Sequence, residues 1–176
     1  MKGGLGVVEI NLQEQFARIR SGDREAFSCV YQEMKQPVYT ICYRITGSKE
    51  TAEDITHDVF VKLFRSPPDT SVKNMRAWIF QMARNLSIDA LRKQSRMAEQ
   101  GEPICTEDPY PPIHLRMDLE AALRSLSREE REILTLHLNA DLGFKEIASI
   151  VGLSLPATYR KYRKALKNVQ TELNGG

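Results

Sequence analysis

The sequence has few of the features that mark a membrane, secreted or metal-binding protein. Its 176 residues contain no apolar run near the ~18 residues that a membrane-spanning helix needs, and the N-terminal apolar run is too short for a secretion signal. Three cysteines (Cys29, Cys42 and Cys105) are widely spaced without a CxxC pair, which predicts reduced thiols of a cytoplasmic protein. The three histidines are equally scattered, so we expect no metal site and no cofactor.

The alternation of apolar and polar residues that marks β-strands is also absent, and no internal repeat is visible. Apolar residues recur at helical spacing instead. The predicted fold is all-α, with an N-terminal helical domain (residues 1–94), a flexible linker (95–116) and a C-terminal helix-turn-helix domain (117–176). The linker is predicted from its lack of helical periodicity, its acidic excess and four prolines, Pro103, Pro109, Pro111 and Pro112.

Helix boundaries follow from caps and breakers. In the N-terminal domain the pattern predicts helices over 11–20, 25–46, 48–65 and 73–93, with residues 66–72 as a loop and residues 1–10 untethered. Pro37 is expected to kink or split the second helix, and Gly47 to end it. In the C-terminal domain a helix begins near Met117, and Ser127 with Glu130 forms a capping box for the next.

Residues 143–169 (GFKEIASIVGLSLPATYRKYRKALKNV) predict two short helices joined by a tight turn. Ala148 is a small residue at the helix crossing, Gly152 ends the first helix, and Ser154 is a candidate N-cap for the second. The second helix carries five cations on one face, Arg160, Lys161, Arg163, Lys164 and Lys167. This pattern is typical of a helix-turn-helix that binds the DNA major groove, and the alternative is a helical hairpin with a solvated basic face.

The net charge of only +2 conceals a segregation of charge along the chain. Residues 143–176 have six Lys or Arg against two Glu, giving +4, whereas residues 118–142 have three Arg against six acids, giving −3. A local basic patch attracts phosphate whatever the total charge, so the balance is compatible with nucleic-acid binding.

Two features of the N-terminal domain allow more than one interpretation. Glu50, Asp54 and Asp58 follow one another at i,i+4 spacing, which gives either a solvated acidic face or a docking surface for a basic partner. Trp78 lies near the start of the predicted helix 73–93, which has a line of polar residues flanked by arginines. It is either a core residue or an aromatic platform for unstacked bases.

Three stretches together resemble the extracytoplasmic-function sigma factors of bacterial RNA polymerase: TGSKETAEDITHDVFVKLFR (46–65), MRAWIFQMARNLSIDALRKQSR (75–96) and LRSLSREEREILTLHLNADLGFKEIASIVGLSLPATYRKYRKAL (123–166). The resemblance covers about residues 22–173. It implies a promoter-specificity subunit with no active site of its own, and core RNA polymerase (the clamp helices of the largest subunit, and the flap) as its partner. It also implies a role in a stress or envelope response and regulation by an anti-sigma protein, which commonly holds members of this family silent.

The resemblance assigns roles to particular residues. The first stretch would dock on polymerase, through Asp54, His57, Asp58 and Lys62. The second would read the minus-ten element as a melted non-template strand with a flipped base, through Arg76, Trp78, Asn85, Arg92 and Lys93. The third would read the duplex minus-thirty-five element, through Ser154, Tyr159, Arg160, Lys161 and Lys164.

The sequence departs from the family pattern at four of these positions or their neighbours. Pro156 stands where a small residue is usual, Thr158 replaces an aliphatic core residue, Tyr162 replaces a leucine, and His57 replaces a common glutamine. A buried hydroxyl weakens packing unless it is hydrogen-bonded. The DNA sequence preference of relatives therefore does not transfer to this chain.

Three other functions compete with this interpretation. An autonomous transcription factor would bind its operator without polymerase, and it would leave the N-terminal motifs unexplained. A recombinase with a helix-turn-helix tail would need a nucleophile among arginines, usually on an α/β domain, and neither is visible. A helical adaptor that binds only protein would have no use for a basic helix.

Overall fold

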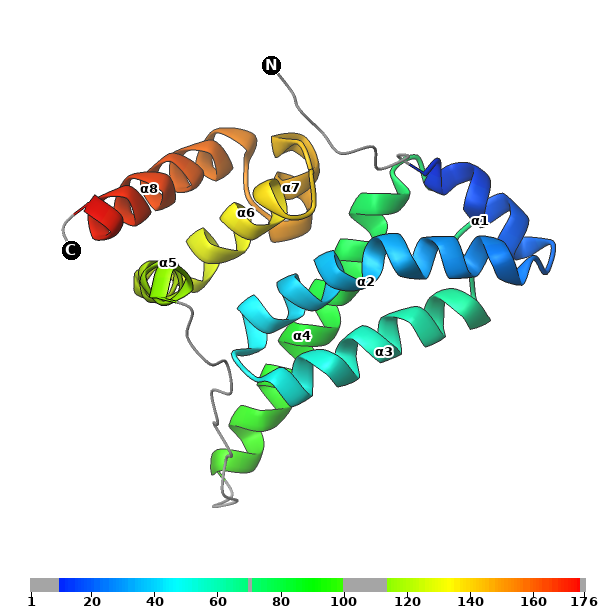
Figure 1. The fold of residues 1–176 in the computed structure, drawn as a ribbon, viewed down its shortest axis with the longest axis horizontal. Helices are drawn as coiled ribbons and strands as arrows, with labels where there is room; N and C mark the ends of the chain where they lie inside the picture. Colours follow the sequence, from blue (N-terminus) through cyan, green and yellow to red (C-terminus); the bar gives the residue numbers. More distant parts are fainter. Residues whose placement is uncertain (1–9, 70, 100–113, 175–176) are drawn as a thin grey trace.

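The computed structural model describes residues 10–69, 71–99 and 114–174, and these form eight helices without a strand (Figure 1). The predicted all-α fold is confirmed. The helices are α1 (Leu12–Arg20), α2 (Arg24–Thr46), α3 (Lys49–Arg65), α4 (Met75–Glu99), α5 (His114–Ser125), α6 (Arg128–Leu138), α7 (Phe144–Val151) and α8 (Leu155–Asn174).

The first three helices begin and end within one residue of the predicted bounds. Asn11, Asp23 and Ser48 each accept a backbone N–H bond at the start of α1, α2 and α3. Gly47 ends α2 in the left-handed conformation with φ of 70°. Of the kink or split expected at Pro37, the split does not occur, because α2 continues through Pro37 as one helix with buried residues on both sides of it.

The predicted boundaries of the linker need correction at both ends. Helix α4 continues to Glu99, five residues beyond the predicted domain end, and α5 begins at His114. The segment Gln94–Glu99 consists mostly of good helix formers and contains no proline or glycine, so nothing stops the helix there. The rest of the predicted linker and residues 1–9 lie outside the described residues.

Helix α2 is the centre of the N-terminal domain, because it packs against α1, α3 and α4. The core between these helices consists of side chains that are almost fully buried, including Phe16, Val30, Met34, Ile41, Val59, Leu63, Ile79 and Phe80. In the C-terminal domain, α8 packs against α5, α6 and α7. A second cluster there is formed by Ala122, Leu123, Leu126, Leu134, Ala165 and Val169.

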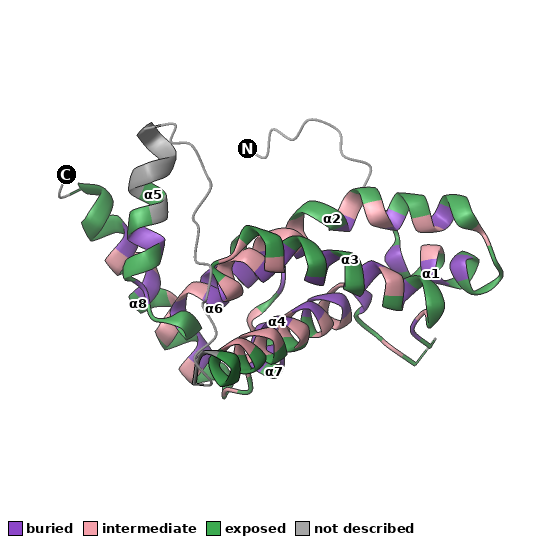
Figure 2. Cartoon of the chain, turned by 90° about the horizontal axis from the view of Figure 1, so that it is seen from below, coloured by how far each residue is buried: buried purple, intermediate pink, exposed green. Residues whose placement is uncertain are grey.

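The two domains are in direct contact, which the prediction of separate tethered modules did not include. Helix α6 packs on α2 and α7 packs on α4, while α5 and α8 project away from the N-terminal helices (Figure 2). Apolar side chains of the C-terminal domain join the N-terminal core, namely Ile133, Leu136, Ala140, Leu142, Ile147 and Ile150. We call these helix contacts the interdomain contact.

A buried ion pair lies in the interdomain contact. The Arg84 guanidinium on α4 donates to the Glu132 carboxylate on α6, and Glu132 has only 2% of its side-chain surface exposed. Burial raises the pKa of Glu132, against the opposing effect of the Arg84 charge. The buried Glu132 charge is tolerated because the Arg84 guanidinium, which belongs to the other domain, pairs with it.

Candidate nucleic-acid interface

Helices α7 and α8 form the predicted helix-turn-helix. Gly152 has φ of 73°, and its N–H and that of Leu153 both bond to the Ala148 carbonyl at 3.0 Å, which closes the turn. Ser154 then caps α8 by accepting the Ala157 N–H at 3.3 Å. The predicted roles of Gly152 as the helix end and of Ser154 as the N-cap are therefore confirmed.

The unusual core residues of α8 have partners. The Thr158 hydroxyl is buried but donates to the Ser154 carbonyl at 3.0 Å, so it carries no unpaired polar group. The Tyr162 ring packs edge-on against His137 (4.9 Å between centroids) and Phe144 (5.0 Å). Aromatic packing thus replaces the expected leucine contact, and the departures from the family pattern leave the motif intact.

The predicted cations of α8 fall into two groups. Arg160 is exposed. Lys161 and Lys164 instead pair with acids at the start of α6, Lys161 with Glu129 and Lys164 with Glu130, each at 2.9 Å. The hydrogen bond to Glu129 raises the pKa of Lys161. Both lysines would have to exchange a carboxylate for a phosphate in order to bind DNA.

Two exposed cations were missed in the sequence-based assignment of DNA contacts. Arg163 and Lys167 lie on the side of α8 opposite its buried residues, Thr158, Ala165 and Val169. At 100° per residue they share this outward face with Arg160. Counting 100° per residue from the buried residues of α8 would have identified Arg163 and Lys167 from the sequence. Both face solvent more directly than Lys161 does.

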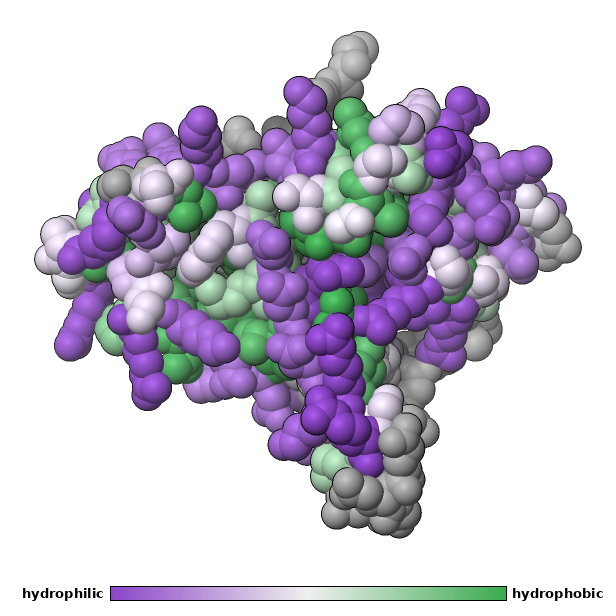
Figure 3. Space-filling model, turned by 180° about the vertical axis from the view of Figure 1, so that it is seen from behind, coloured by the Kyte–Doolittle hydropathy of each residue, from purple (hydrophilic) through white to green (hydrophobic). Residues whose placement is uncertain are grey.

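On α4, three predicted DNA contacts lie together. Asn85, Arg92 and Lys93 are exposed, and Arg92 pairs with Asp89 one turn earlier at 3.4 Å. The C-terminal part of α4 is the hydrophilic projection at the bottom of Figure 3. A polar and cationic helix surface of this kind suits contacts with a nucleic-acid backbone and with base edges.

The other two predicted contacts on α4 are placed differently. Arg76 lies half a turn around the helix from Asn85 and pairs with Glu33 of α2 at 3.4 Å. Trp78 is partly buried against the N-terminal core. The partial burial of Trp78 therefore fits its interpretation as a core residue. Arg76 links α4 to α2 in this conformation.

The loop before α4 is held by α1, whose role the sequence did not reveal. The Gln13 amide donates to the Val72 carbonyl at 2.7 Å, and the Arg20 guanidinium donates to the Pro68 carbonyl at 2.7 Å. Both are contacts between residues about 50–60 positions apart, and no local pattern predicts them. They position the loop that leads into the polar face of α4.

The acidic face predicted on α3 is solvent-exposed. Asp54, His57, Asp58 and Lys62 are all exposed, as is Glu50 one turn before Asp54. In the described residues, the only ion pair formed by α3 joins Lys49 to Glu53 at 3.8 Å. The carboxylates of Asp54 and Asp58 are thus available to a basic partner.

The described cysteines and histidines do not converge on a site. Cys29 is exposed and Cys42 is buried, and burial raises the pKa of Cys42 to about 11. Cys105 lies outside the described residues. In the part of the chain that is described, no three His, Cys, Asp or Glu side chains lie close enough to hold a metal ion, and no helix is both long and apolar enough to cross a membrane.

Comparison with known proteins identifies both domains. The model of sigma-70 region 2 matches residues 30–97, and that of sigma-70 region 4 matches residues 116–169. SigE of Mycolicibacterium smegmatis, an extracytoplasmic-function (ECF) sigma factor, is 31% identical over 128 residues, which are 67% of this chain. The chain belongs to the ECF group of sigma-70 factors.

Other members of the family are more distant but cover more of the chain. The ECF sigma factor SigW of Bacillus subtilis is 20% identical over 94% of this chain and 98% of its own length. The chain spans only half the length of the SigE relative.

Among solved structures, the sigma factor RpoE in complex with the anti-sigma factor NepR from Bartonella quintana has a TM-score of 0.69 at 21% identity, covering 84% of this chain and 96% of that one. CnrH in complex with the cytosolic domain of CnrY has a TM-score of 0.65 at 19% identity, with 93% and 97% covered. These likenesses support the fold.

Proposed function

We propose that this ECF sigma factor directs core RNA polymerase to specific promoters, with α3 as its docking surface. Asp54 and Asp58 would meet basic side chains on the clamp helices of the largest subunit, with His57 and Lys62 at the edge of the contact, and the C-terminal domain would meet the flap. The observation that carries this proposal is the exposure of separate acidic and basic faces on two sigma domains. The polymerase supplies the chemistry.

In the same proposal the two domains read two promoter elements. The exposed polar face of α4 would hold the melted non-template strand of the minus-ten element. The exposed face of α8 would enter the major groove of the minus-thirty-five element, with Arg160 and Arg163 among its contacts. Lys161 and Lys164 join after leaving their α6 partners.

The interdomain contact adds a conformational step to this function. The two elements are separated by about 25 base pairs, or roughly 85 Å at 3.4 Å per pair. Domains that share one core cannot lie on both elements at once. We infer that the closed arrangement belongs to the free chain, and that docking on polymerase separates the domains. An anti-sigma protein, such as NepR in the complex with RpoE, would compete for these surfaces in the cytoplasm.

Run-off transcription tests the proposal. Core polymerase with this chain should start transcripts on genomic fragments that core polymerase alone leaves silent, and the two should co-purify. Failure of both would refute the proposal.

Duplex binding without polymerase separates this function from that of an autonomous transcription factor. The chain alone should bind promoter duplex poorly, because separating and ordering its domains opposes binding. Tight, dimeric operator binding by the isolated chain would favour the transcription factor instead.

A further inference from the structure

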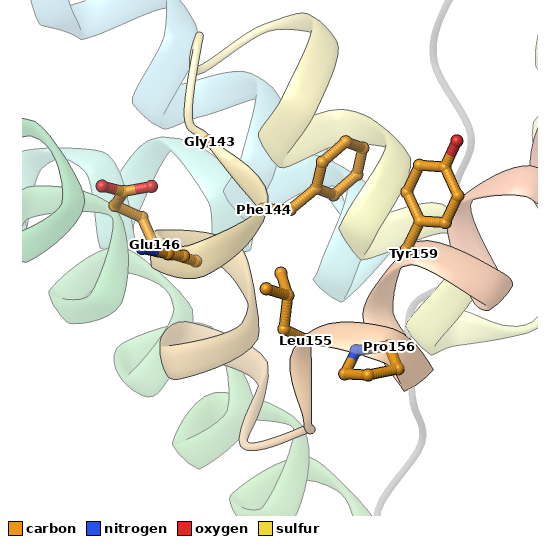
Figure 4. A pocket seen from close by; sticks show the side chains of 7 residues that line it. Gly143, Phe144, Glu146, Leu155, Pro156 and Tyr159 are labelled. Carbon is orange, nitrogen blue, oxygen red and sulfur yellow. The ribbon is translucent and has the colours of Figure 1, made fainter.

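The start of α8 carries an open groove with apolar walls, although the rest of the exposed face of that helix is basic. Phe144 of α7 and Leu155, Pro156 and Tyr159 of α8 line it. In Figure 4 Leu155 points toward the start of the Phe144 side chain, and the Phe144 ring extends toward Tyr159, which lies beside it. Leu155 is 42% exposed and Tyr159 is 47% exposed.

Packing of the domain does not account for these two side chains. Leu155 belongs to neither apolar cluster of the described residues. Tyr159 contacts Phe144 edge-on, with 5.3 Å between ring centroids, and about half of the residue remains exposed. Exposed apolar side chains that line one groove indicate a binding surface.

The charges around the groove indicate what occupies it. Arg160 and Arg163 are exposed next to it on α8, and Lys145 is exposed at its α7 rim. Cations beside an apolar patch suit a polyanion that also offers an apolar group. Glu146 forms part of the rim and would repel a phosphate. We therefore expect contacts with the phosphate backbone of a bound polyanion on the side of the groove where Arg160 and Arg163 lie.

Duplex DNA offers one such apolar group in the major groove, the C5-methyl of thymine. The groove lies in the first turns of the second helix of the helix-turn-helix, the part that faces base edges in this motif. We propose that Leu155 and Tyr159 contact a thymine methyl in the minus-thirty-five element and so determine part of the promoter specificity. This inference rests on the proposed function of the C-terminal domain.

Replacing thymine by deoxyuridine removes the methyl group alone and tests the contact. On a promoter mapped by run-off transcription, each thymine of the minus-thirty-five duplex is replaced in turn, on both strands, and binding of polymerase with this chain is measured. We expect a loss of about fourfold at one or two positions, the value for returning one methyl-sized group to water. Leu155→Ala or Tyr159→Ala should abolish the difference between thymine and uracil at those positions.

Arg163→Ala is the matched control. It removes an exposed side chain from the same helix, and it should weaken binding equally on thymine and uracil templates. Circular dichroism checks that each variant keeps its helices, although the template substitution itself does not depend on the folding of any variant.

The inference fails if transcripts start normally but every thymine can be replaced without effect. It also fails if the element contains no thymine on either strand, or if both groove variants keep the full preference for thymine. Absence of transcripts on every template would instead overturn the proposed function, and the inference with it.

Discussion

Replacing Arg84 by alanine is expected to open the interdomain contact. The substitution leaves the Glu132 carboxylate buried without its partner, with 2% of its side-chain surface exposed. Loss of one member of a buried ion pair costs about 3–5 kcal/mol. We expect about 3 kcal/mol, the lower end, because Arg84 keeps 19% of its surface in water and because separating the domains lets Glu132 reach solvent.

A change of about 3 kcal/mol alters the ratio of closed to open chain by roughly 150-fold. Small-angle X-ray scattering should therefore show a larger radius of gyration for Arg84→Ala, while circular dichroism shows the helices retained. Core polymerase should bind this variant more tightly than the wild-type chain, since the domains no longer have to be separated. Arg92→Ala is the matched control, because Arg92 lies on the same helix in a pair that is 68% exposed and is expected to contribute little.

The pH dependence distinguishes release of the contact from general damage. Burial raises the pKa of Glu132, so the closed form binds a proton more readily than the open form does. The closed form should therefore be favoured at low pH. Its advantage should be lost as the pH rises from the ordinary pKa of a glutamate carboxyl through the raised pKa of Glu132. In Arg84→Ala, acidification should restore compact scattering. A variant that stays compact at neutral pH, with unchanged affinity for polymerase, would refute this reasoning.

Three further predictions concern other parts of the chain. Charge reversal of Asp54 and Asp58 should weaken binding to core polymerase without changing the thermal midpoint, because both are exposed; unfolding of the variant would favour a structural role. Ser127→Ala should lower the free energy of unfolding by about 1 kcal/mol in denaturant titrations, since the α6 capping box is lost, and an unchanged midpoint would contradict this. In the native protein at pH 8, alkylation mapped by mass spectrometry should modify exposed Cys29 and spare Cys42, whose pKa burial raises to about 11; equal labelling would show that Cys42 is accessible.

Local signals predicted most of the helices and the turn of the helix-turn-helix. Ser127 and Glu130 form the predicted capping box, and Gly47 and Gly152 end their helices in the left-handed conformation. These features depend on residues within a few positions of one another, so a pattern in the sequence is enough to predict them. The exposure of Asp54 was equally predictable, because the apolar stripe of α3 fixes which face is buried.

The sequence could not predict which partner each charged side chain meets in the folded chain. Arg76, Lys161 and Lys164 were all assigned to DNA through the family resemblance, yet each pairs with an acid of another helix. The resemblance to a family describes the promoter-bound role of such residues. It contains no information on the intramolecular pairs that hold them in the free chain, which depend on the geometry of helix packing.

Helix α6 explains why the domain contact escaped prediction and what opening it requires. Leu134 faces the cluster of the C-terminal domain, whereas Ile133 and Leu136 join the N-terminal core, so the helix is apolar on two sides. An apolar pattern shows that a face is buried but not which element covers it. Separation of the domains returns part of Ile133, Leu136 and Ile147 to water, and full exposure of each such side chain would cost about 1.5–3 kcal/mol. A partner that holds the chain open must therefore cover apolar surface on α6 and α7 as well as supply charge. The Arg84→Ala variant without polymerase should consequently bind a hydrophobic fluorescent dye more strongly than the wild-type chain does, and added core polymerase should displace that dye. If scattering shows that the variant has opened but its dye binding does not increase, these side chains stay covered within their own domain.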